Sequence, residues 1–169
     1  MESEIKTNFH RIHKLCVLGL LLALSLILSY VESLIPVFFY LPGAKLGLAN
    51  LVIVLTLYRY GAKEAILLNV LRVFLVAFLF TNGFSLLYSI SGALFSFGIM
   101  VLAKKFFRLH VITVSSLGGV FHNLGQILVA GIAMQTVTVL TFLPFLILVG
   151  AITGVVLGIL ANMMLRYMR

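Results

Sequence analysis

A long stretch near the C-terminus of this chain carries no ionised side chain. Between residues 111 and 165 there is no Asp, Glu, Lys or Arg, and only His122 could carry a charge. A helix that crosses about 30 Å of hydrocarbon needs roughly 20 mostly apolar residues. The rest of the chain agrees, since hydrophobic residues make up 63% of its 169 residues and charged residues only 9%. The sequence therefore predicts an all-α integral membrane protein.

Charged residues and turn signals divide the chain into six predicted spans. Pro36 and Pro42 interrupt the apolar pattern after the first span, and the run Thr81-Asn82-Gly83 is a turn signal. A polar cluster at residues 135–138 divides the C-terminal stretch. The predicted spans are residues 15–31, 46–58, 62–80, 84–103, 111–134 and 139–165. The chain is then a single transmembrane domain, 1–169, with residues 1–13 as a short N-terminal segment outside the membrane.

The positions of the basic residues predict the orientation of these spans. If the N-terminus is cytoplasmic, ten of the 12 Lys and Arg residues fall on the inner side. Only Lys45 falls outside, and only Arg72 falls within the membrane. Because Lys and Arg are enriched in cytoplasmic loops, both termini are predicted to be cytoplasmic, in a multi-pass protein of the cytoplasmic membrane. The net charge of +8 is spread as one short cluster per loop, which disfavours nucleic-acid binding.

The missing residue types exclude several kinds of enzyme. The chain has no Asp, so it lacks the Asp-rich motifs that hold magnesium and diphosphate, and it has no phosphate-binding Gly-rich loop. Its one cysteine, Cys16, can form neither an internal disulfide nor a CxxC metal site, and its apolar neighbours predict a buried thiol. We therefore expect a protein that is not an enzyme and has no catalytic residue, metal or cofactor.

Arg72 is the first polar residue in a predicted span that needs an explanation. An ionised Arg at a helix centre costs about 2.5–3.5 kcal/mol on insertion scales, so it should face protein or a wet cavity. Asn69 precedes it by three residues and shares its helical face. Arg72 could form a structural pair with Glu32 or a backbone carbonyl. Alternatively, it could bind an anionic ligand together with Asn69.

A second polar group lies in the fifth predicted span. His122, Asn123 and Gln126 fall within five residues and can share one wide polar stripe. Gly118, Gly119 and Gly125 flank them and would let a helix or a ligand approach closely. The stripe is interpreted either as hydrogen-bonding contacts between helices or as the lining of a ligand site.

The loop between the first two spans is unusually apolar. It contains the successive aromatics Phe38, Phe39 and Tyr40, and it ends at Lys45, the only predicted outer cation. Because such a loop would be poorly solvated in water, it could fold over the mouth of the bundle as a lid. The same aromatics could instead form an interfacial belt.

Small residues mark possible packing faces on the first and last spans. Gly19 and Ala23 are spaced i, i+4, and Gly150, Gly154 and Gly158 continue the same spacing on the sixth span. Such spacing lets helix backbones come close together. Either these faces pack within the molecule, or they contact a partner protein.

Two sequence runs resemble a known membrane family. They are PGAKLGLAN at residues 42–50, which ends at Asn50, and VFHNLGQ at residues 120–126. The family is called the Gx transporters and is also described as heptaprenyl diphosphate synthase component I. The similarity extends over roughly residues 14–165, and its members resemble the substrate-binding S components of energy-coupling-factor vitamin transporters.

The resemblance implies an S-component-like bundle of six helices with cytoplasmic termini, an outward-open cavity and a lid formed by the first loop. It also implies a transmembrane scaffold subunit and two ATPases as partners. Gly19 and Ala23 match the small positions that contact the scaffold, with Gly standing where Ala is more usual. Under the other description, the chain would be a noncatalytic partner of a soluble prenyl diphosphate synthase.

These observations predict a membrane-embedded substrate-binding component of a small-molecule transporter. Its ligand would be partly apolar and anionic, such as a phosphorylated isoprenoid or a vitamin-like cofactor. The alternative is a noncatalytic component I that acts with a polyprenyl diphosphate synthase in isoprenoid quinone biosynthesis. The predicted ligand-binding residues are Glu32, Lys45, Asn50, Asn69, Arg72, His122, Asn123 and Gln126.

Overall fold

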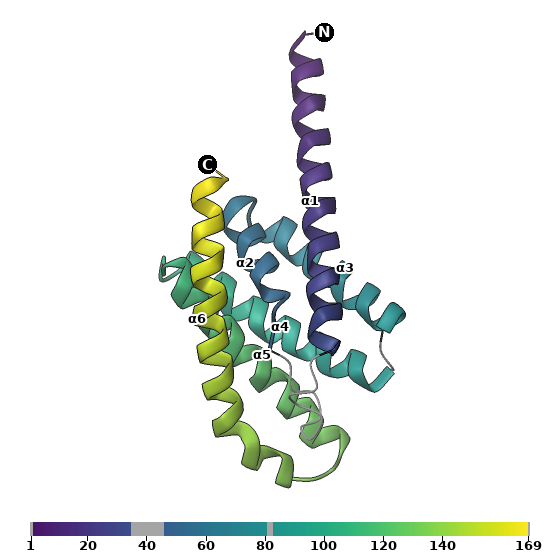
Figure 1. The fold of residues 1–169 in the computed structure, drawn as a ribbon, viewed down its shortest axis with the longest axis vertical. Helices are drawn as coiled ribbons and strands as arrows, with labels where there is room; N and C mark the ends of the chain where they lie inside the picture. Colours follow the sequence, from purple (N-terminus) through teal and green to yellow (C-terminus); the bar gives the residue numbers. More distant parts are fainter. Residues whose placement is uncertain (1, 35–45, 81–82, 169) are drawn as a thin grey trace.

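The computed structural model describes residues 2–34, 46–80 and 83–168, and these ranges form six α-helices and one short 3₁₀ helix, with no strand among them (Figure 1). The elements are α1 (Glu2–Leu34), α2 (Asn50–Arg59), α3 (Ala62–Phe80), α4 (Gly83–Lys105), α5 (Val111–Ala133), η2 (Thr138–Phe142) and α6 (Leu143–Tyr167). The all-helical prediction is confirmed. The first helix begins at Glu2, so the predicted N-terminal segment continues the helix of the first span.

Four helical segments are long and apolar enough to cross a membrane. They are Arg11–Leu34, Leu86–Lys105, Val111–Ala133 and Thr138–Tyr167. The helix α3 has 19 residues, but the charged residues Lys63, Glu64 and Arg72 leave no long uncharged stretch in it. The helix α2 has only 10 residues, fewer than the predicted span 46–58.

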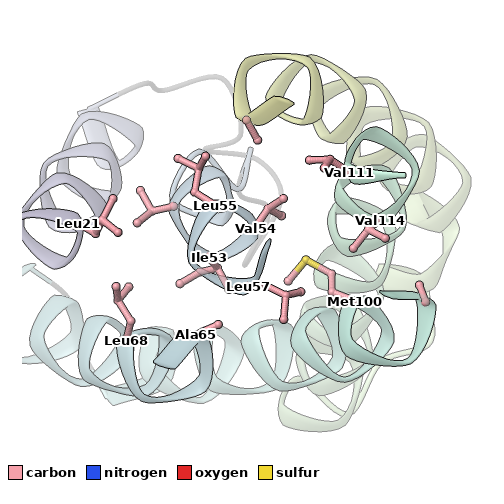
Figure 2. Packing of buried hydrophobic residues seen from close by; sticks show 13 residues of the cluster. Leu21, Ile53, Val54, Leu55, Leu57, Ala65, Leu68, Met100, Val111 and Val114 are labelled. Atoms are coloured by element: carbon pink, nitrogen blue, oxygen red, sulfur yellow. The ribbon is translucent and has the colours of Figure 1, made fainter. Parts of the chain in front are cut away.

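The short helix α2 is the centre of the bundle. At 1.5 Å per residue it is about 15 Å long, roughly half the thickness of the hydrocarbon core. Its residues from Val52 to Leu57 are all essentially inaccessible to solvent. Figure 2 shows its side chains reaching toward Leu21 of α1, Leu68 of α3, and Met100 of α4. A helix that is apolar all round is buried on every side, as α2 is here.

The C-terminal end of α2 is fixed by polar contacts. Lys104 of α4 donates a hydrogen bond to the Leu57 carbonyl (2.5 Å) and lies 4.7 Å from the centre of the Tyr58 ring. The Tyr58 hydroxyl donates to the Leu109 carbonyl, at 2.7 Å. Carbonyl groups at a helix C-terminus lack intrahelical partners and favour a cation, so Lys104 satisfies this end.

Glycines let α5 and α6 lie almost backbone to backbone. A methyl group at Gly154 would come within 2.6 Å of the Ser116 Cα, and one at Gly119 within 2.2 Å of the Gly150 carbonyl oxygen. Gly158 packs against Ile112 in the same way. For α6, the interpretation of its small residues as an intramolecular packing face is confirmed.

The side of α1 that carries its small residues faces outward. Gly19 and Ala23 are exposed, and no atom outside α1 would lie within 4 Å of a methyl group at Gly19. Cys16 lies on this exposed side, so the prediction of a buried thiol is wrong. The opposite side of α1 packs on α2 and α3, and Lys14 forms an ion pair with Glu64 at the start of α3.

The N-terminal part of α1 extends beyond the rest of the bundle, and the C-terminal end of α6 lies toward this same end of the molecule (Figure 1). An even number of membrane crossings requires both termini to lie on the same side of the membrane. In the same view, α6 runs roughly along the axis of α1, whereas α3 and α4 lie largely across it.

Candidate functional site: a buried polar layer

A layer of buried polar side chains separates two apolar clusters of the bundle. The larger cluster surrounds α2 and includes α3 as far as Leu68 and α5 as far as Leu117. The smaller cluster lies toward the opposite end, around Ile127, Ala130 and Leu146. The polar residues between them occupy the next turns of the same helices. We call the following set the polar layer: the buried Asn50, Asn69, Arg72, His122, Asn123 and Gln126, together with the half-buried Glu32.

On α3, the polar layer contains a buried cation. Only 7% of the Arg72 surface is exposed to solvent, and its Nη2 donates a hydrogen bond to the Asn69 Oδ1 at 2.9 Å. Asn69 in turn donates to the Ala93 carbonyl of α4 at 3.3 Å. The predicted shared face of Asn69 and Arg72 is therefore confirmed. The Arg72 Nε is buried and makes no hydrogen bond within the described part of the chain.

Glu32 connects the end of α1 to the start of α2. Its Oε1 accepts a hydrogen bond from the Gly47 backbone N–H at 2.6 Å, and its carboxylate attracts the Arg72 guanidinium electrostatically. Gly47 has a φ of +76°, which favours glycine, and it precedes the turn that leads into Asn50. Asn50 is buried at the N-terminus of α2, where the helix dipole is positive.

On α5, His122, Asn123 and Gln126 are all buried. The Asn123 Nδ2 donates to the Leu146 carbonyl of α6 at 2.9 Å, so one half of this amide connects two helices. Its Oδ1 and both amide atoms of Gln126 have no hydrogen-bond partner among the residues that the structure describes. The interpretation of these side chains as hydrogen-bonding contacts between helices is therefore correct for the Nδ2 of Asn123. It does not account for the amide of Gln126.

The helix α4 brings the two sides of the polar layer together through a glycine that the sequence analysis did not single out. A methyl group at Gly92 would lie 2.7 Å from Cγ of Gln126 and 2.9 Å from the His122 carbonyl oxygen. The next residue, Ala93, accepts the hydrogen bond from Asn69. The α3 and α5 parts of the layer thus flank α4 at one level. The small residues at positions 91–93 were the available sequence signal, since small residues permit close helix approach.

Several predicted residues are not part of this layer as described. Lys45, Phe38, Phe39 and Tyr40 lie outside the described residues. Gly19 and Ala23, predicted to contact a partner, lie on the exposed side of α1.

The layer offers a guanidinium, a carboxylate, an imidazole and four amides, all of which can form hydrogen bonds. In the described ranges, no three His, Cys, Asp or Glu side chains lie together as a metal site would require. Polar and ionisable side chains that are buried inside an apolar membrane bundle often mark ligand or ion pathways. The long apolar helices and this layer define the class of the molecule, an all-helical membrane protein.

Within that class, the chain belongs to the family described as heptaprenyl diphosphate synthase component I. The family model matches residues 21–164, which include the whole polar layer. The family resemblance expected from the sequence is thereby confirmed. Neither the comparison with curated proteins nor the comparison with solved structures found a match.

Proposed function

We propose that this protein is the membrane-embedded, substrate-binding component of a small-molecule transporter, of the S-component type. The polar layer carries the proposal, because several of its buried amide and guanidinium atoms have no hydrogen-bond partner within the described part of the chain. The ligand would be partly apolar and anionic, such as a phosphorylated isoprenoid or a vitamin-like cofactor. Arg72 would receive its acidic group, and the surrounding aromatic and aliphatic side chains would cover its apolar part.

The proposed topology has six crossings with both termini in the cytoplasm of a cytoplasmic-membrane protein. The helix α2 would be part of the second crossing, residues 46–58, because its own 10 residues reach only half the depth. The partners would be a transmembrane scaffold subunit and two ATPases. The exposed side of α1 around Gly19 and Ala23 would contact the scaffold, because it is free of neighbours within the described chain.

A second candidate function follows from the description of the family. Component I of a heptaprenyl diphosphate synthase would associate with a second, soluble synthase component. In that function the present chain would be noncatalytic, since prenyl chain elongation uses magnesium held by Asp-rich motifs and this chain has no Asp. The polar layer would then hold the prenyl diphosphate or its precursor in the membrane.

Native mass spectrometry of the gently solubilised protein from its own host separates these two functions. Retention of a membrane scaffold with ATPases, or of a bound small molecule with such a scaffold, is the result expected for the transporter component. Retention of a soluble prenyl synthase without a scaffold would contradict the transporter proposal and favour the second candidate. Removal of the chain should then change the product length of that synthase.

A further inference from the structure

The polar atoms left for a ligand in the polar layer differ between its two sides. On the α2–α3 side they are the Nε of Arg72 and the Nδ2 of Asn50, which are both donors. On α5 they include the Oδ1 of Asn123 and the Oε1 and Nε2 of Gln126. One side thus offers donors and a positive charge, and the other offers mainly acceptors.

A hydrogen bond fixes the role of the remaining Asn123 atom. The Asn123 Nδ2 donates to the Leu146 carbonyl, so the other amide atom must be the acceptor oxygen. For Gln126 both amide atoms lack described partners, so either orientation of the amide presents one donor and one acceptor. The Nε of Arg72 can only donate.

We infer that the ligand carries, besides its acidic group, a neutral group with N–H or O–H donors, such as a carboxamide, a lactam or a hydroxyl, and that this neutral group binds at Asn123 and Gln126. The inference rests on the proposed binding function, whose site it deepens. An acidic group at α5 would face the Asn123 oxygen with only the Gln126 amide as a donor, whereas at Arg72 it meets a donor and a positive charge, in competition with the Glu32 carboxylate.

A simple prenyl diphosphate matches the donors near Arg72 but not the unpartnered amide atoms on α5. Its hydrocarbon chain has no donor for the Asn123 oxygen and no partner for the Gln126 amide. Those groups would stay buried without hydrogen bonds, which is unfavourable because they have lost their hydration. The α3 and α5 sides contact α4 at the neighbouring residues Ala93 and Gly92, so the two sets of polar atoms lie at one level of the bundle.

Three probes test the inference on the full-length protein in lipid nanodiscs. Flavin mononucleotide has a phosphate and a lactam N–H, riboflavin has the lactam without the phosphate, and farnesyl diphosphate has the acid with a plain hydrocarbon chain. The wild-type protein should bind flavin mononucleotide at least about ten-fold tighter than either other probe, a difference that corresponds to about 1.4 kcal/mol. Quenching of flavin fluorescence, and competition by farnesyl diphosphate, give the affinities.

Two variants test which side of the polar layer binds which group of the probe. Gln126→Met should weaken flavin mononucleotide about ten-fold and leave farnesyl diphosphate unchanged, whereas Arg72→Gln should weaken both acidic probes. Gly98→Ala is the matched control, since Gly98 is exposed on α4 with no neighbour within 4 Å of an added methyl group. Size-exclusion chromatography checks that each variant is folded.

The order of the wild-type affinities decides the outcome even if a variant fails to fold. Tighter binding of farnesyl diphosphate, equal binding of both acidic probes, or binding of no probe would each overturn the inference. The proposed transporter function fails separately, through the identity of the retained protein partner. A soluble synthase partner together with the expected probe order would reject the transporter and keep the ligand class.

Discussion

At the scale of single residues, the burial of Gln126 is not explained by its packing within the protein. Only 2% of its surface is exposed, and neither amide atom has a partner in the described chain. An unsatisfied buried polar group costs roughly 1–3 kcal/mol. A protein would retain such a side chain at a place where a ligand supplies the missing hydrogen bonds.

Gln126→Met should therefore stabilise the ligand-free protein. The thioether fills a similar volume without a polar group, and we expect the free energy of unfolding to rise by about 1 kcal/mol. Thermal unfolding in detergent, followed by intrinsic fluorescence or circular dichroism, measures the change. Asn123→Leu serves as the contrasting control, because it removes the bond to the Leu146 carbonyl and should lower stability. A loss of stability in Gln126→Met would show that the amide has a structural role.

Substitutions of Glu32 and Arg72 should change the affinity for an acidic ligand in opposite directions. The carboxylate of Glu32 attracts the guanidinium of Arg72 and so competes with any anion that binds there. Glu32→Gln should strengthen the binding of an acidic ligand about ten-fold, while Arg72→Gln should weaken it by at least as much. The glutamine can still accept the hydrogen bond from Gly47, so the local backbone should be unchanged.

The two variants also report the charge of the ligand. Equilibrium binding of flavin mononucleotide and of pyrophosphate to each purified variant gives the affinities. Weaker binding of both anions to Glu32→Gln would contradict the competition. It would favour a site in which Glu32 orients a cationic group of the ligand.

At the scale of helices, the contact between α5 and α6 depends on the glycines of α6. Gly154→Ala should destabilise the protein by about 1–3 kcal/mol, because the new methyl group would overlap the backbone of Ser115 and Ser116. Gly98→Ala, at an open position of α4, should be neutral or should stabilise by up to about 1 kcal/mol through helix propensity. Thermal unfolding of both variants in one detergent compares them. Equal stability of the two would mean that α5 and α6 can separate without loss.

The helices themselves were largely predictable from the sequence. The predicted ranges 62–80, 84–103 and 111–134 agree closely with α3, α4 and α5, because charges and turn residues mark their ends. The short length of α2 was not predicted, since an apolar run that is buried by protein looks like one that is buried by lipid. Periodicity also grouped Asn69 with Arg72. It could not show that Gly92 faces Gln126, because that contact depends on which helices become neighbours.

At the scale of the whole molecule, the arrangement of the helices predicts which loops are accessible from each side of the membrane. Val137 and Phe107 are exposed positions beyond the two ends of α5. In a Cys16→Ser background, Val137→Cys should react with a membrane-impermeant thiol reagent on intact cells. Phe107→Cys should react only after permeabilisation, because the basic residues around it predict a cytoplasmic loop. The reverse labelling pattern would place both termini outside.

The exposed side of α1 should matter for assembly with a partner rather than for folding. Gly19 has no neighbour outside its own helix, so Gly19→Leu should change the free energy of unfolding by no more than about 0.5 kcal/mol. If a scaffold helix packs closely on Gly19 and Ala23, the leucine side chain should prevent that approach while ligand binding is retained. Affinity purification of the variant from membranes, with quantification of the co-purified subunits, measures the loss.

Gly98→Leu is the matched control for this experiment, since it makes the same change at an open, exposed glycine of another helix. Loss of the partner in Gly19→Leu but not in Gly98→Leu would place the interface on α1. Equal retention in both variants would mean that the small residues of α1 only face lipid. A partner that is lost from both would indicate a general intolerance of bulk on the lipid-facing surface. Neither of these last two results would be compatible with a specific docking side on α1.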